Sequence, residues 1–322
     1  MVNADYFHSK TTDLLNRKSL NDISGLKYYW ANDGSLRNDG IELNVKVRAV
    51  DIRDFKFDFG ATIGHYKNKV LSLANGNFTT EVAGGEILTS VGHPVGLFYG
   101  YQTDGVYSTA QEAHDANLYI KNTSGQLIPF EAGDMRFVNQ NAGEDNVIDE
   151  KDKVILGDPN PDIYGNFNLN FKYKHFKLSA LFTYSLGNDA YNALRASLES
   201  GKDLHNQTAA MAGRWMADGQ QTNIPRAVYD DPMGNSRFSD RWIEDASYLK
   251  FKRLMLSYDI PFQTSFLQNI SVWAAVNNVC TLTKYLGGDP EFSYGNSTLY
   301  QGVDAGYIPQ SRSFQLGVNI SL

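Results

Sequence analysis

Two neighbouring stretches, Ile41-Glu-Leu-Asn-Val-Lys-Val-Arg-Ala49 and Phe55-Lys-Phe-Asp-Phe-Gly-Ala-Thr-Ile63, alternate apolar and polar residues along their whole length. Successive side chains of a β-strand point to opposite faces, so a period of two predicts strands with one apolar and one polar face. A short polar turn around residues 52–53 joins the two stretches. Together they predict an antiparallel pair of half-buried strands.

The same alternation recurs along the chain, and it ends with Phe314, Leu316, Val318 and Ile320 facing away from Ser, Gln, Gly and Asn. In residues 248–260 the apolar parity switches near Lys252, which predicts a β-bulge because one extra residue reverses the two faces. The pattern predicts about ten strands, near residues 1–13, 39–51, 54–69, 81–91, 95–107, 163–174, 176–186, 247–260, 269–282 and 311–322.

The connections between these predicted strands alternate in length. The short turns are at residues 52–53, 92–94, 175 and 261–268, and the long polar links are at 14–38, 70–80, 108–162, 187–246 and 283–310. Transmembrane barrels show this asymmetry, with short periplasmic turns and long extracellular loops. The chain is therefore predicted to be all-β, as about ten strands of an antiparallel transmembrane β-barrel. Helical pieces are expected within the extracellular loops at 189–199 and 208–217.

Composition supports a β-rich chain and excludes several function classes. Tyr and Phe, which favour pleated surfaces, number 19 and 18 among 322 residues. The net charge of −7 argues against a nucleic-acid partner, which needs an excess of Lys and Arg. A single cysteine, Cys280, excludes an internal disulfide and a cysteine zinc site. No run of about 18 apolar residues predicts a spanning helix, but barrel strands need none.

Seven spaced stretches, in the same order along the chain, resemble the last part of SusC/RagA-type TonB-linked outer-membrane proteins. Two of them are Gly92-His-Pro-Val-Gly-Leu-Phe-Tyr-Gly100 and Thr283-Lys-Tyr-Leu-Gly-Gly-Asp-Pro-Glu291. The other five are residues 5–15, 32–42, 157–162, 243–249 and 307–310. Taken together in this order, the seven stretches are specific, and they cover nearly the whole chain.

The resemblance implies a barrel of about 22 strands, plugged by an amino-terminal domain, that imports a nutrient such as a glycan or peptide. It also implies the outer membrane of a Gram-negative, Bacteroidetes-like cell, its lipid, a SusD-like surface lipoprotein and the TonB system as partners. Residues 1–322 are expected to be the carboxy-terminal part of such a receptor, without the plug domain. Ten strands leave two unpaired edges, which lipid does not tolerate, so the chain alone should not form a working pore. Either it pairs with the missing amino-terminal half of the barrel, or it is a truncated gene product.

An acidic stretch at residues 141–152 is similar to a calcium-binding loop. Asp145, Asp149 and Asp152 stand where oxygen ligands belong around an anchoring Ile148. However, Asn146 stands where such loops turn on a glycine. Calcium is therefore one hypothesis for this stretch, with no other cofactor expected, and a solvated turn is the alternative.

Trp215 and Trp242 follow arginines in or beside the longest link. An exposed indole could stack on a sugar ring of the substrate. Alternatively, these rings pack the loop onto the barrel or anchor it at the headgroup level. The sequence favours packing over substrate binding.

No catalytic residues are predicted. The six histidines lack metal-ligand spacing, and no serine has the context of a nucleophile. One alternative is a soluble or surface-exposed all-β binding module or adhesin, which would turn its apolar face inward. Another is an enzyme that acts on glycans, which would need a cleft with paired carboxylates. The direction of Phe55, Phe57, Phe167 and Phe171 distinguishes the adhesin from the transmembrane barrel.

Overall fold

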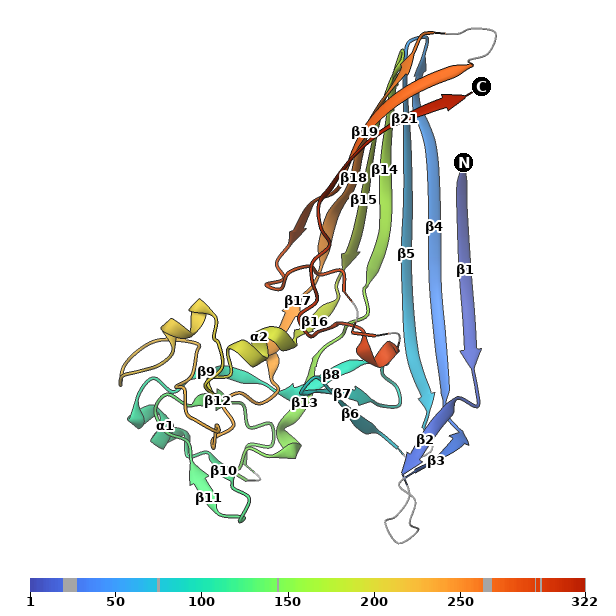
Figure 1. The fold of residues 1–322 in the computed structure, drawn as a ribbon. Helices are drawn as coiled ribbons and strands as arrows, with labels where there is room; N and C mark the ends of the chain where they lie inside the picture. The colour runs from blue at the N-terminus through green and yellow to red at the C-terminus, as the bar shows by residue number, and fades with distance from the viewer. Residues whose placement is uncertain are drawn as a thin grey trace.

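The computed structural model describes residues 1–19, 28–73, 76–143, 145–262, 268–292, 294–295 and 297–321. Its main feature is one antiparallel sheet of eight long strands, each paired with the next long strand in chain order (Figure 1). The strands are β1 (Val2–Thr11), β4 (Ser35–Ile52), β5 (Phe55–Ser72), β14 (Ile163–Tyr173), β15 (Phe176–Leu186), β18 (Tyr248–Ile260), β19 (Asn269–Thr283) and β21 (Ser313–Ser321). This is an up-and-down meander, as the alternating pattern predicts.

The links between these strands confirm the predicted alternation of lengths. Short turns join β4 to β5, β14 to β15 and β18 to β19 at one end of the sheet, and both termini lie toward that end (Figure 1). Lys174 has a φ of 51° and closes one of these tight turns. Residues 263–267 of the third turn lie outside the described residues. Every long link leaves from the opposite end, here called the loop end.

The predicted bulge in β18 is confirmed. Leu181 of β15 lies opposite Arg253 and Phe182 lies opposite Phe251, so Lys252 has no partner in this ladder. On the β19 side the register also shifts there, and Asn278 adopts a φ of 52°. The extra residue switches parity, which keeps Phe251 and Leu254 on the same face of the sheet.

Two predicted barrel strands are wrong. Residues 81–91 and 95–107 do form strands, but these belong to smaller sheets at the loop end. β6 (Phe78–Val82), β7 (Gly85–Thr89), β8 (Leu97–Tyr101) and β13 (Lys153–Gly157) form a four-stranded sheet, and β9 (Thr103–Val106) pairs with β12 (Met135–Phe137). The main sheet therefore has eight strands and not ten. The predicted turn at 92–94 lies at the loop end, where Gly92 and His93 exchange backbone hydrogen bonds with Val70.

The predicted helical pieces are partly confirmed. Residues 189–199 form a strand, β16 (Asp189–Asn192), and then α2 (Ala193–Leu198), which is capped by the Asn192 side chain. Residues 208–217 contain only a 3-10 turn, η3 (Ala209–Gly213). An unpredicted helix, α1 (Ala110–Ala116), begins at the Thr109 cap. No helix in the described ranges is both long and apolar enough to cross a membrane.

The remaining short elements also lie in the long links. They are β2 (Leu15–Ser19) with β3 (Tyr28–Asn32), β10 (Tyr119–Lys121) with β11 (Leu127–Pro129), η2 (Glu150–Asp152), η4 (Asp240–Trp242), β17 (Ile243–Asp245), η5 (Thr298–Tyr300) and β20 (Val303–Asp304). We call residues 73–162 the first loop, 187–247 the second loop and 284–312 the third loop, and the three together the loop assembly. The described buried cores all lie in this assembly, and none of them lies on the long sheet.

Candidate functional site

One face of the long sheet carries an uninterrupted apolar row across seven strands. The ladder places these side chains directly opposite one another: Val47, Phe59, Leu169, Ala180, Leu254, Val276 and Phe314. Phe57 stacks on Phe171 and Phe167 on Phe182, with ring centroids 4.6 Å apart in each pair. Phe314 and Leu316 remain 76% and 85% exposed. A continuous apolar surface of this size, left uncovered, marks a membrane or partner interface.

The opposite face is polar. The neighbouring row reads Arg48, Asp58, Asn170, Ser179, Met255, Ala275 and Gln315. Arg48 donates from Nε to Asp58 at 2.8 Å, and Lys177 pairs with Asp259 at 2.7 Å. A sheet with one apolar and one polar face, and no core of its own, has the construction of a barrel wall between lipid and a wet lumen.

The third loop is attached to the polar face by a buried lysine. Lys250 of β18 is 2% exposed, and its ammonium lies 2.7 Å from Asp289 and 3.1 Å from Glu291. Lys252, at the bulge, reaches the same Glu291. Burial alone would raise the pKa of both carboxyl groups, but hydrogen bonds from the lysines outweigh it, and both pKa values lie below the ordinary range. Both carboxylates are therefore held ionised against the sheet.

The three loops share one hydrophobic core. It combines Phe98 and Ile87 of the first loop, Tyr191 and Trp242 of the second, and Val303 of the third. β16 of the second loop pairs with β20 of the third in parallel and with β17 in antiparallel fashion. Because side chains from distant parts of the chain complete this core, the loops form a single preassembled unit at the end of the sheet (Figure 1).

Polar contacts also join the first loop to the second. Arg226 makes a bidentate pair with the fully buried Asp134, at 2.8 and 3.0 Å. The guanidinium of Arg237 lies over the rings of Tyr101 and Phe137, with its central carbon 4.8 and 4.6 Å from the ring centroids. Burial lowers the pKa of Arg237. Partly buried cations of this kind are stabilised when they are paired or stacked, which favours one arrangement of the two loops.

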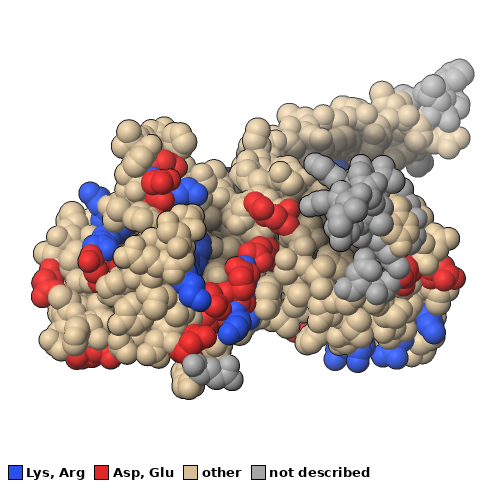
Figure 2. All heavy atoms as spheres, turned by 90° about the horizontal axis from the view of Figure 1, so that it is seen from below, with Lys and Arg blue, Asp and Glu red and all other residues tan. Residues whose placement is uncertain are grey.

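A pocket of about 420 Å³, here called the mouth pocket, lies where the polar face of the sheet meets the loop assembly. Tyr248 and Ser185 line it from the sheet, and Glu291, Phe292 and Gln301 line it from the third loop. Aromatic faces beside amide and carboxylate groups suit a sugar or peptide ligand. Seen from the loop end, Asp and Glu side chains gather in a band along the middle of this face, with Lys and Arg beside them (Figure 2). Sequence reasoning did not find this pocket, because its walls come from strands and loops that are distant in the chain.

The structure places both predicted tryptophans in packed positions. Trp242 is fully buried, donates from Nε1 to the Arg237 carbonyl at 3.1 Å, and lies under the guanidinium of Arg241. Trp215 is half-buried against the core of the first loop and donates to the Ser108 carbonyl at 3.0 Å. Trp242 therefore offers no free ring face to a sugar.

The three predicted calcium ligands are engaged by the chain itself. Asp152 is fully buried and accepts from the backbone of Gln140 and Asp149, at 2.8 Å in both cases. Asp149 caps η2 by accepting from Lys151, and Asp145 accepts from Val147 and Asn141. Residue 144 of this stretch lies outside the described residues. Calcium binding stays a prediction, and the geometry shows a loop closed by its own hydrogen bonds.

In the described part of the chain, no three His, Cys, Asp or Glu side chains converge closely enough to hold a metal ion. Asp189 has a raised pKa because it is buried, but its carboxylate accepts from the backbone of Asp158 at 2.9 Å and closes a loop. Arg241 is desolvated, which lowers its pKa to about 10, and it stacks on Trp242. The contacts of Asp189 and Arg241, whose pKa values are shifted, hold the loops together.

Comparisons with known proteins match nearly the whole chain to one segment of longer receptors. TonB-dependent receptor P3 of Formosa agariphila is 30% identical over 331 residues, which covers 98% of this chain and 32% of that receptor. TonB-dependent receptor SusC of Bacteroides thetaiotaomicron is 25% identical over 333 residues, covering 98% of this chain and 29% of SusC. No protein-family model matches the chain.

Solved structures agree on the fold. A chain of the RagAB peptide transporter superposes with a TM-score of 0.78 at 21% identity, covering 99% of this chain and 33% of that chain. The chain thus spans about a third of the length of the proteins it matches, at their carboxy-terminal end. The curated relatives are TonB-dependent receptors, and the structural neighbour belongs to a peptide transporter. The eight-stranded sheet is therefore part of a transmembrane β-barrel wall.

Proposed function

The chain matches, along nearly its whole length, the carboxy-terminal barrel part of SusC/RagA-type TonB-dependent receptors, and we propose that it serves as that part of an outer-membrane nutrient importer. In this role its apolar face lies against lipid and its polar face lines the lumen. The short turns face the periplasm, and the loop assembly faces outside.

The apolar row across seven strands carries this proposal. A soluble binding module or adhesin would cover such a row with a second layer, but none of the three described cores includes a residue of the row. Phe57 and Phe171 instead stack on each other along the sheet, on the face away from the polar row. Lipid is the solvent that suits this surface.

The nutrient is a glycan or a peptide, and it contacts the mouth pocket and the loop assembly. A SusD-like lipoprotein covers the outer surface, and TonB acts on a plug domain. The remaining strands come from outside these 322 residues and pair with the open edges of β1 and β21. The plug domain also comes from outside these residues and lies within the completed barrel. The chain contributes binding and passage, and no reaction. The cell is of a Bacteroidetes-like, Gram-negative type.

Co-purification from outer membranes tests the proposal. An affinity tag inserted beside Leu204, which is 93% exposed in the second loop, leaves both edge strands free. We expect detergent extracts to yield the tagged chain with a plug-bearing barrel segment and a SusD-like lipoprotein, identified by mass spectrometry. Recovery of the wild-type chain from the soluble fraction alone, without partners, would refute the proposal.

A further inference from the structure

Charged side chains replace the apolar ones where the apolar face of β1, β4 and β5 approaches the loop end. Lys10, Arg37 and Lys69 lie directly opposite one another in the ladder, and His8, Asp39 and Lys67 form the adjacent row. We call Lys10, Arg37, Lys67 and Lys69 the cationic patch. Like charges placed opposite each other destabilise a sheet, so three cations in one row need an external counter-charge.

The chain supplies only part of that counter-charge. Asp39 forms an ion pair with Arg37, with its carboxylate 2.8 Å from Nε, and also contacts His8. One carboxylate therefore faces four cations and a histidine. Lys10, Lys67 and Lys69 are exposed and form no ion pair within the described ranges. Asp158 and Asp162 stand nearby, across a groove, and the Asp162 carbonyl is held by His65.

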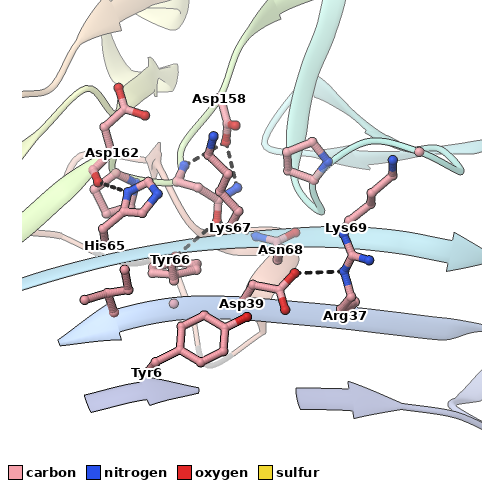
Figure 3. A pocket seen from close by; sticks show the side chains of 16 residues that line it. Tyr6, Arg37, Asp39, His65, Tyr66, Lys67, Asn68, Lys69, Asp158 and Asp162 are labelled. Atoms are coloured by element: carbon pink, nitrogen blue, oxygen red, sulfur yellow. Dashed lines mark hydrogen bonds and ion pairs between the residues drawn. The ribbon is translucent and has the colours of Figure 1, made fainter. Parts of the chain in front are cut away.

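The groove lies beside the patch and has a volume of about 470 Å³. Arg37, Lys67 and Lys69 line its charged side (Figure 3). Tyr6 and Ile41 also line it, and they lie opposite each other at the near end of the apolar rows. The first loop also lines it, through Gly92, Pro94, Asp158, Asn160, Pro161 and Asp162. The site therefore combines cations, a cavity and an adjoining apolar track.

The position of the cationic patch along the strands shows which layer of the membrane it faces. From Ile52 to Ile41 the apolar side chains of β4 extend about 37 Å along the strand, or about 26 Å across a membrane at a tilt of about 45°. This matches the apolar band of an outer-membrane barrel, which is about 25 Å tall. The patch begins directly beyond the band, at the level of the outer headgroups.

We propose that the cationic patch binds the phosphate groups of a phosphorylated glycolipid of the outer leaflet, whose acyl chains lie along Tyr6, Ile41 and Ile63. Basic clusters at headgroup level bind anionic lipid, and in the described part of the chain Lys10, Lys67 and Lys69 form no ion pair. The inference rests on the proposed function only for the placement of the sheet in the outer membrane. It goes beyond import, because it concerns the lipid-facing side of the wall and not the lumen.

The test uses the assembled protein extracted from outer membranes, with any barrel partner that accompanies it, and diphosphorylated lipid A as the probe. Native mass spectrometry measures how much lipid A the delipidated protein retains. The triple variant Lys10→Gln, Lys67→Gln, Lys69→Gln should retain it at least about tenfold more weakly, and Lys69→Gln alone should show a partial loss. The matched control removes three lysines elsewhere, as Lys46→Gln, Lys172→Gln, Lys174→Gln, and should bind lipid A like the wild type.

Dephosphorylated lipid A should bind the wild type as weakly as lipid A binds the triple variant. Equal retention by wild type and triple variant overturns the inference, and so does an equal loss in the control. Displacement of lipid A by low concentrations of inorganic phosphate would assign the patch to a free anion and also overturn it. If the wild type inserts but retains no lipid A, this inference alone fails; if it never reaches the outer membrane, the proposed function fails.

Discussion

At the scale of single residues, Lys250 joins the third loop to the sheet through two carboxylates. Its ammonium is almost inaccessible to water and serves Asp289 and Glu291 together. Removing one member of a buried ionic group leaves the others desolvated and unpaired, at a cost of about 3 kcal/mol. Lys250→Met should therefore release the third loop, seen as faster hydrogen exchange in residues 284–292.

The control for Lys250 is Lys172→Met, which removes an exposed lysine from the same face of β14. It should leave the exchange of the third loop unchanged. If both variants exchange like the wild type, the ionic contact does not hold the loop, and its attachment depends on the shared core instead.

The same contact makes the third loop sensitive to acid. The pKa values of Asp289 and Glu291 lie below their ordinary values of 3.8 and 4.5. A lowered folded-state pKa contributes stability that is present above the ordinary pKa and is lost as the pH falls through the lowered one. Attachment should thus be complete at pH 5–7, weaken once the pH falls below the ordinary pKa values of 3.8 and 4.5, and be lost as the pH passes through the lowered ones. Hydrogen exchange corrected for intrinsic rates measures this. The Lys250→Met variant should show no such transition.

The buried ring of Trp242 supports the core of the loop assembly. It is fully buried, and its ring packs beneath Arg241. Trp242→Ala would leave a cavity and an unpaired Arg237 carbonyl, which together cost about 3–5 kcal/mol. In the Trp242→Ala variant, proteases should cleave the loop assembly at concentrations that leave the wild-type protein intact. Leu204→Ala, at a 93% exposed position, is the control, and equal resistance of both variants would contradict this role.

At the scale of elements, adjacent residues of one strand should respond oppositely to the same substitution. Leu169 lies in the apolar row and Asn170 in the polar row of β14. An arginine at mid-membrane on the lipid face costs about 2–4 kcal/mol, whereas a lumen position tolerates it. Leu169→Arg should lower the yield of folded protein in outer membranes, measured by heat-modifiable migration on gels. Asn170→Arg should fold like the wild type, and similar yields would exclude a lipid-facing row.

The elements that sequence predicts well are those whose alternation is set by a single apolar face. β4, β5, β14, β15 and β21 were predictable because lipid requires every second side chain to be apolar, and even the bulge at Lys252 followed from the break in parity. Residues 95–101 have a similar local pattern, but Leu97, Phe98, Gly100 and Tyr101 are buried within the loop assembly. A period of two does not state which sheet a strand joins, because that depends on partners distant in sequence.

The candidate site was less predictable for a related reason. Tyr248, Phe292 and Gln301 meet at the mouth pocket only because the third loop folds back onto β18. Lys250 and Asp289 lie 39 residues apart, and no local pattern pairs them. The tryptophans were recognisable as notable residues, but whether they face a ligand or a core is decided by loop packing. Residues 141–152 show the same limit, since a carboxylate that caps a turn resembles a ligand in sequence.

At the scale of the whole molecule, the chain has two parts that are stabilised by different solvents. The long sheet depends on lipid against its apolar row, whereas the loop assembly depends on its own buried cores. A substitution that unfolds the loop assembly should therefore leave the long sheet folded in the membrane. Val303 tests this separation, because it is fully buried, belongs to the third loop, and contacts side chains of the first and second loops.

Val303→Asp would place an unpaired charge in the shared core, which that core cannot solvate. We expect proteases added to whole cells to cleave all three loops, including residues 81–106 and 190–242, which lie far from residue 303 in sequence. The barrel should still insert, with wild-type heat-modifiable migration, while the lipoprotein lid no longer co-purifies. Ile308→Asp, at a neighbouring position that is 93% exposed, should change neither readout. Cleavage confined to the third loop would show that the loops fold separately, and loss of insertion would show that the sheet needs the loop assembly to form.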